Sequence, residues 1–210
     1  MSSASEDGES LAVTTAPARR RGRPVSLESR KAVLTTAAGL LDERGFAGFT
    51  IDEVARRSGV SKATIYKHWT SGYEVAVDAY GSIVTDAVPV IDTGDVVADL
   101  TGQIRRLAEF YASPRGRVIA QLLAAGTGQQ RGSALLREKF FAPRRAGTTA
   151  LIEQGKADGQ LRPDLDTELA IDLLFGPIVF RLFNGITPLD ADGAGALARM
   201  ALRAVVPGHD

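Results

Sequence analysis

Hydrogen-bonding side chains are concentrated in a short segment, residues 61–68, where only Ile65 is an obvious core residue. The other side chains must therefore face something other than the protein interior. Lysine can donate to guanine O6 and N7, and the methyl groups of alanine and threonine can touch the thymine methyl group. The major groove of DNA would accept such a surface, which is formed by Lys62, Ala63, Thr64, Tyr66 and Lys67.

The surrounding residues predict two short helices joined by a tight turn. Thr50 and Glu53 form a capping-box pattern, so we expect a helix to begin at about Ile51. Gly59 suits the positive φ of a sharp reversal, and Ser61 is a suitable N-cap for the next helix. Residues 50–69 therefore read as a helix-turn-helix.

The sequence shows no pattern typical of an enzyme or a metal site. There is no cysteine, HExxH motif or glycine-rich phosphate loop, and the two histidines, His68 and His209, have no metal-site spacing. The acidic group at residues 164, 166, 168 and 172 lacks a calcium-loop pattern and favours a turn followed by the first turn of a helix. We expect no catalytic residues, no cofactor and no metal.

The arm RGRP at residues 21–24, a long first helix and the segment TIDEVARRSGVSKATIYKHW resemble the TetR family of dimeric transcriptional regulators. The resemblance covers roughly residues 19–80. It implies that Thr50 and His68 hold phosphates and that Arg21 or Arg23 enters the minor groove, although this arm could also be a solvated tail. The DNA-binding residues expected are Arg21, Arg23, Thr50, Ser61, Lys62, Ala63, Thr64, Tyr66, Lys67 and His68.

Basic charge gathers beside this motif. Residues 19–70 contain eleven Lys or Arg and five Asp or Glu, whereas the whole chain has a net charge of zero. A basic end attached to a neutral body suits a module that binds phosphate groups. Double-stranded operator DNA is therefore the first expected partner.

Helix patterns and breakers predict an all-α fold of about nine helices. We expect a disordered tail with a basic arm at 1–24, a three-helix DNA-binding head at 25–72, and a larger helical ligand-binding and dimerisation domain at 73–210. Ser71 with Glu74 should cap a fourth helix that Pro89 ends. Further helices are expected near 93–112, 115–126, 131–157, 166–184 and 189–206, with Pro143 kinking or splitting the third of these.

Apolar side chains surround almost the whole circumference of the predicted helix 166–184, so we expect it to be buried on all sides, with a partner chain supplying part of the cover. The resemblance implies that the last two helices pair with their mates in a homodimer; the alternative is a purely intrachain core. The interface residues expected are Leu173, Gly176, Phe180, Phe183, Leu197 and Ala201.

The resemblance also implies a pocket for an unidentified small-molecule effector that releases the protein from DNA. A DNA-binding protein without an effector, and an activator, remain open alternatives to a repressor. The candidate pocket residues lie on helices between the fourth and seventh: Tyr80, Gln103, Arg106, Phe110, Tyr111, Arg117 and Gln121.

Two further features bear on location and affinity. The longest apolar run has eight residues, far below the roughly 18 of a membrane span, and the N-terminus lacks a signal-peptide pattern, so a cytoplasmic protein with no membrane partner is expected. Where the family usually has a phosphate-binding lysine at the start of the fourth helix, this chain has Gly72. We expect the missing charge to weaken DNA binding and reduce its salt dependence.

Overall fold

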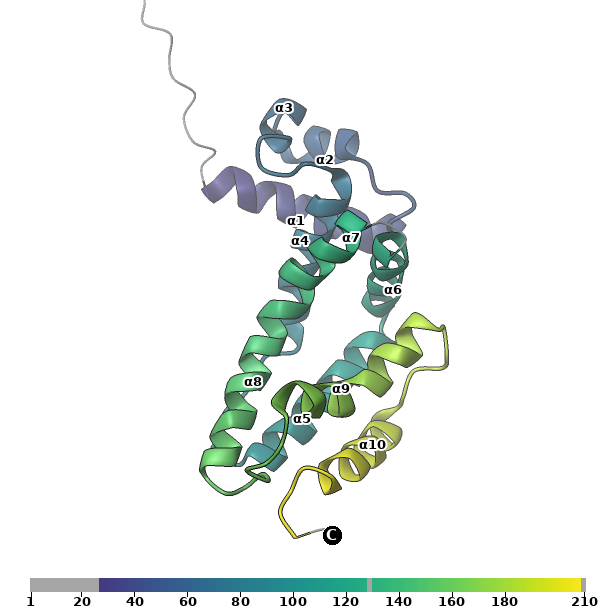
Figure 1. The fold of residues 1–210 in the computed structure, drawn as a ribbon. Coiled ribbons are helices and arrows are strands. Elements are labelled where there is room, and N and C mark those ends of the chain that lie inside the picture. The colour runs from purple at the N-terminus through teal and green to yellow at the C-terminus, as the bar shows by residue number, and fades with distance from the viewer. Residues whose placement is uncertain (1–26, 128–129, 209–210) are drawn as a thin grey trace, which may run out of the picture.

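The computed structural model describes residues 27–127 and 130–208, so the predicted tail and arm, including Arg21 and Arg23, lie outside the described residues. Within these ranges the chain is all-helical (Figure 1). The helices are α1 (Leu27–Arg44), α2 (Ile51–Ser58), α3 (Lys62–Ile65), α4 (Gly72–Ala87), α5 (Val96–Ala112), α6 (Pro114–Thr127), α7 (Gln130–Leu135), the π-helix η1 (Leu136–Phe141), α8 (Ala142–Ala157), α9 (Thr167–Phe183) and α10 (Ala191–Arg203).

Helix α2 begins and ends at the predicted residues, and α3 begins directly after the predicted cap and ends at Ile65. The Thr50 hydroxyl accepts from the Glu53 amide at 3.3 Å, and Gly59 ends α2 with φ 70°. Ser61 caps α3 by accepting from the Thr64 amide at 3.1 Å. The reciprocal half of the first capping box is not formed, because the Glu53 carboxylate is bound by arginines of its own helix.

Helix α4 belongs to both parts of the molecule. Val75 and Ala79 complete the small core of the head, in which Trp69 is buried beneath this helix. Ala76 and Val77, on the other side of α4, are buried in the larger core of the body. Figure 1 shows the head at one end and α5, α9 and α10 at the other, with α4 running between them. Any rotation of α4 must therefore disturb one core or the other.

The segment predicted as one helix at 131–157 is a continuous helical run made of α7, η1 and α8. Pro143 lies in the first turn of α8, directly after η1, so the predicted interruption takes the form of a π turn between two α-helices. A proline cannot donate to the carbonyl four residues earlier, here that of Lys139, and its ring crowds that carbonyl. The chain instead widens into a π turn, in which the amide of Ala142 bonds the carbonyl of Arg137.

Helix α9 buries only one face within its own chain. Ala170, Ile171, Leu174 and Ile178 pack into the body, whereas several large apolar residues on the opposite face remain exposed. The expectation of burial on all sides is thus not met by a single chain. None of the helices in the described ranges has the length and apolar character needed to cross a membrane.

Candidate DNA interface and effector pocket

The recognition surface is the polar side of α3 and the turn that follows it. Lys62, Ala63, Lys67 and His68 are exposed, and Tyr66 is 52% exposed. Ile65 alone of this segment is buried, at 0% exposure. The head therefore forms its core without these side chains, which are left to contact another molecule.

Two local contacts hold this surface in shape. The Ser61 hydroxyl donates to the Thr64 hydroxyl at 2.9 Å while it accepts from the Thr64 amide, which leaves the Thr64 O–H free to donate outward. Lys62 Nζ lies 3.0 Å from Asp52 Oδ1, and both side chains are mostly exposed. An exposed pair of this kind contributes only about 0–1 kcal/mol, so Lys62 can leave it for a base at little cost.

The two arginines of the motif are engaged within the head. Arg56 and Arg57 both donate to Glu53, and these hydrogen bonds lower the Glu53 pKa to about 2. Arg57 also reaches Glu43 at 2.9 Å. The predicted phosphate ligand Thr50 is exposed at the start of α2, and His68 is exposed beside Trp69. Arg57 therefore joins α2 to α1, whereas Arg56 binds Glu53 within α2.

Gly72, the first residue of α4, lies against α2. A Cβ at this position would stand 3.2 Å from Cγ1 of Ile51 and 3.6 Å from the Phe49 ring. The first contact is tighter than an ordinary van der Waals contact. A lysine here would thus require Ile51 to move by a few tenths of an ångström.

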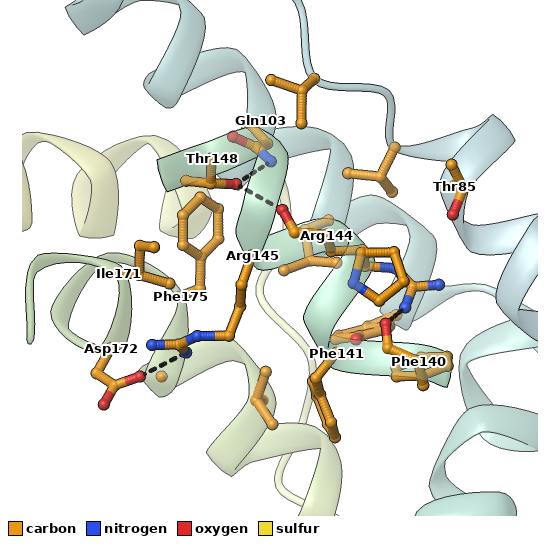
Figure 2. Close-up of a pocket in the computed structure, with 17 residues that line it drawn as sticks. Thr85, Gln103, Phe140, Phe141, Arg144, Arg145, Thr148, Ile171, Asp172 and Phe175 are labelled. Carbon is orange, nitrogen blue, oxygen red and sulfur yellow. Dashed lines mark hydrogen bonds and ion pairs between the residues drawn. The ribbon is translucent and has the colours of Figure 1, made fainter. Parts of the chain in front are cut away.

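The body contains a cavity of about 340 Å³ between α4, α5, α8 and α9 (Figure 2). This volume is near the lower end of the range for small-molecule pockets, about 300–1,000 Å³. Its walls are mostly apolar and aromatic. The lining residues are Thr85, Val88, Val90, Gln103, Leu107, Tyr111, Phe140, Phe141, Pro143, Arg144, Arg145, Thr148, Ile171, Asp172, Phe175, Gly176 and Val179.

Of the seven pocket residues expected from sequence, Gln103 and Tyr111 line this cavity. Phe110 is buried beside Tyr111 but is not part of the lining, and Arg117 is exposed on α6. The Arg106 guanidinium lies over Gly102 of its own helix. The pocket wall is instead supplied mainly by η1, α8 and α9, which sequence reasoning did not connect with a ligand.

Tyr80 and Gln121, also expected in the pocket, join the head to the body. The Tyr80 hydroxyl donates to Asp42 of α1, which Arg115 of α6 also contacts at 2.9 Å. Gln121 Oε1 accepts from the Phe46 amide at 2.7 Å. Burial, followed by the bond to Asp42, raises the pKa of Tyr80, so its hydroxyl remains a donor at neutral pH.

A second junction connects α7 and η1 with Thr70, which follows the helix-turn-helix, and with the start of α4. Arg131 donates to the Thr70 hydroxyl at 2.8 Å, and Lys139 donates to Glu74 at 2.9 Å. Glu74 is nearly buried and also accepts from the Thr70 amide at 2.7 Å. The indole of Trp69 and the guanidinium of Arg30 both donate to Asp78, one turn further along α4.

The acidic group at the start of α9 serves the fold. Asp166 caps the helix by accepting from the Leu169 amide at 3.0 Å, and Arg162 reaches Asp164 at 2.9 Å. Arg145 of α8 binds both Glu168 and Asp172. Among the described residues, no three His, Cys, Asp or Glu side chains are placed to hold a metal ion.

The exposed apolar face of α9 forms one continuous stripe, which we call the α9 seam: Leu169, Leu173, Gly176, Phe180 and Phe183. Its four large members are 66%, 44%, 60% and 49% exposed in chain order. On α10, Leu197 is half-buried and Ala201 is buried in its own chain, while Met200 is exposed. Four of the six predicted interface residues therefore lie on the seam.

A helix-turn-helix head with an outward polar face, carried by a helical body that contains a cavity, defines a DNA-binding regulator rather than an enzyme. Two family models cover most of the chain: residues 33–76 match "Bacterial regulatory proteins, tetR family" and residues 90–201 match "Tetracyclin repressor-like, C-terminal domain". The chain belongs to the TetR family of helix-turn-helix transcriptional regulators, whose members are generally repressors that dimerise.

Individual relatives agree with this assignment over most of their length. The chain is 44% identical over 163 residues to the HTH-type transcriptional regulator YdeS of Bacillus subtilis, covering 78% of this chain and 82% of that one. It is 26% identical to the HTH-type regulator AqdR of Rhodococcus erythropolis, covering 85% and 84%. The crystal structure of the TetR-family regulator SCO0332 matches with a TM-score of 0.77 and 36% identity, covering 86% of this chain and all of that one.

Proposed function

We propose that this protein is a cytoplasmic, homodimeric repressor that binds a palindromic operator and leaves it when a small-molecule effector enters the body. The observation that carries the DNA-binding part is the exposed polar face of α3, from Lys62 to His68, on a head whose core is complete without it. Such a face fits the major groove and reads a few base pairs.

The α9 seam supports the proposed dimer. Its members follow one another at intervals of four and three residues, the spacing of a helix pair in a coiled-coil-like contact. Gly176 at the middle of the seam has open space around its Cβ direction, so a partner helix can approach closely there. A twofold dimer would present two copies of α3 to the two half-sites of a palindrome.

The continuous run of α7, η1 and α8 supports a response to an effector. Its first half contacts the head through Arg131 and Lys139, and its second half lines the cavity from Phe140 to Thr148. A molecule that displaces this wall would pull on Thr70 and Glu74, which lie shortly after the polar segment 61–68. The two arrangements of this run would be the states that DNA and effector select between.

Selection of genomic fragments bound by the purified protein, followed by footprinting, tests the proposal. We expect a palindrome with half-sites about 34–36 Å apart, or a multiple of that distance. Lys62→Ala should lose discrimination at one symmetric pair of positions by about 1–3 kcal/mol, because a lysine contact to guanine is lost.

Arg203→Ala, an exposed basic residue at the end of α10, is the matched control and should leave every position unchanged. If Lys62→Ala weakened all operator positions equally, Lys62 would be a phosphate contact and not a base contact. Bound fragments without twofold symmetry would contradict the dimeric reading of the operator.

A further inference from the structure

Gln103, Thr148 and Arg144 form a polar wall of the cavity between α5 and α8, whereas Arg145 pairs with Asp172 on the α9 side and Thr85 lies on α4 (Figure 2). Gln103 Nε2 donates to the Thr148 hydroxyl at 2.9 Å, and that hydroxyl donates to the Arg144 carbonyl at 3.2 Å. Because the hydroxyl proton is used, the amide of Gln103 must present its nitrogen to Thr148. Its Oε1 is buried and has no hydrogen-bond partner. A buried acceptor without a donor is costly, so this end of the wall calls for a ligand that donates a hydrogen bond.

The other end of the wall carries a positive charge. The Arg144 guanidinium stacks on the Phe140 ring, 3.9 Å from its centroid, and donates to the carbonyls of Phe140 and Gly81. No carboxylate in the described part of the chain pairs with it, and its Nε has no partner. Backbone carbonyls satisfy N–H groups but do not neutralise a buried cation.

Tyr111 of α5 lines the same cavity as Arg144. Burial lowers the pKa of Arg144 to about 10 and raises that of Tyr111 to about 12. The guanidinium is therefore charged and the phenol protonated at neutral pH. Both groups can donate to an anion in the same part of the cavity.

The separation of the two polar ends sets the length of a matching molecule. Gln103 and Tyr111 are eight residues apart on α5, about 12 Å along the helix axis, whereas Thr148 and Arg144 at the same two ends are four residues apart on α8, about 6 Å, so a matching molecule has a length between these values. Between them the cavity is bordered by apolar side chains, among them Leu107, Phe175 and Val179. A small molecule with an apolar middle and two different polar ends fits this arrangement.

We infer that the effector is a small organic acid whose carboxylate binds at Arg144 and Tyr111 and whose distal hydroxyl or amide N–H donates to Gln103. This inference rests on the proposed effector-controlled function. It does not extend to Arg145, whose charge is neutralised at the rim by Glu168 and Asp172, or to Arg106, which does not line the cavity.

Calorimetric titration of the full chain with matched probes tests this inference. The acids are para-hydroxybenzoate, para-hydroxyphenylacetate and para-hydroxycinnamate, each compared with its primary amide and with the acid that lacks the hydroxyl. At least one hydroxy acid should bind at least about tenfold more tightly than its amide, because a charged hydrogen bond is lost in the amide. The acid without the hydroxyl should bind more weakly as well.

Variants of Arg144 assign the effect to this residue. Arg144→Gln should abolish the preference for acid over amide, whereas Arg144→Lys should retain most of it. Arg137→Gln, an exposed arginine on η1, is the matched control and should bind as the wild type does. Gln103→Leu should remove the preference for the hydroxylated acid only. Circular dichroism checks that each variant is folded.

The inference is overturned if no acid is preferred over its amide, or if Arg144→Gln keeps the preference. Operator binding, measured separately without any probe, tests the proposed function. If the protein prefers acids but does not bind operator DNA, the organic-acid assignment of the pocket stands and the proposed repressor function is wrong. If it binds operator DNA but shows no preference for acids, the proposed regulator function stands and the organic-acid assignment is wrong.

Discussion

Single residues in the head serve the fold and the DNA surface together. Ser61 caps α3 and at the same time orients the Thr64 hydroxyl, so the side chain that would face a base is fixed before DNA arrives. Such preorganisation reduces the entropy lost on binding. Asp52 would have a comparable role if Lys62 contacts a base as we propose, since its Oδ1 lies 3.0 Å from Lys62 Nζ.

Gly72 gives a prediction at this scale. Gly72→Lys should place a cation beside the DNA backbone and steepen the dependence of log affinity on log salt by about 0.9, the value for one added phosphate contact. The new Cβ, 3.2 Å from Ile51, should also lower the melting temperature slightly. Anisotropy titrations at several salt concentrations and thermal melts measure the two effects independently.

Gly72→Ala is the matched control, because it introduces the same Cβ contact without the charge. It should share the small loss of stability with Gly72→Lys and keep the salt slope of the wild type. Equal slopes for the alanine and lysine variants would show that position 72 does not approach a phosphate.

At the scale of elements, helix ends follow from local chemistry and were predictable. The hydroxyls of Thr50, Ser61 and Ser71 each accept an amide in the first turn of the helix that follows, as the sequence indicates. The effect of Pro143 could not be predicted from its neighbours in sequence, because the free-energy cost of a proline inside a helical segment depends on whether the surrounding helix can widen. Here η1 absorbs it within one continuous run.

The exposed polar face of α3 could also be predicted from the sequence, because it occupies a single short segment. The cavity was not, because four helices distant in the chain contribute to it. Only Gln103 and Tyr111 were among the residues expected there, and both lie on one helix. The one available signal was an aromatic pair and two arginines flanking Pro143, in the middle of a helical pattern. Assigning Arg144 to a pocket needs the packing of α8 against α4 and α5.

The junction around Glu74 gives a pH prediction. Burial raises the pKa of this carboxyl, but hydrogen bonds from Thr70 and Lys139 outweigh burial and lower its pKa below the ordinary value of 4.5. The stabilisation is therefore complete above pH 4.5 and is lost as pH falls through the lower, folded-state pKa. Glu74→Gln should cost about 1–3 kcal/mol near pH 7, and this difference should shrink below about pH 4.5.

Thermal melts of both proteins between pH 7 and pH 3 measure this difference. Glu109→Gln, an exposed carboxyl that forms no ion pair within the described ranges, should differ little from the wild type at any pH. A constant gap between Glu74→Gln and the wild type across this range would mean that the carboxyl charge does not contribute to the junction.

At the scale of the whole molecule, the part of the chain that the structure describes leaves the polar face of α3 and the α9 seam exposed to solvent. They lie on different parts of the fold, the first on the head and the second on the body (Figure 1). Covering the seam with a second copy brings two heads into one twofold assembly. Affinity for a palindrome then depends on residues that never approach DNA, because each head alone reads only half of the site.

Phe180→Glu tests this dependence, since it places a charge on the seam at a side chain that is 60% exposed in the monomer. The single chain should fold normally, because nothing in its own core is removed. Light scattering should show a monomer, and operator affinity should fall by at least about a hundredfold, because the second half-site no longer adds to binding. Ile91→Glu, at an exposed apolar residue between α4 and α5, should change neither. A variant of Phe180 that stays dimeric would move the interface away from α9, whereas a monomeric variant with full operator affinity would show that each head reads its site alone.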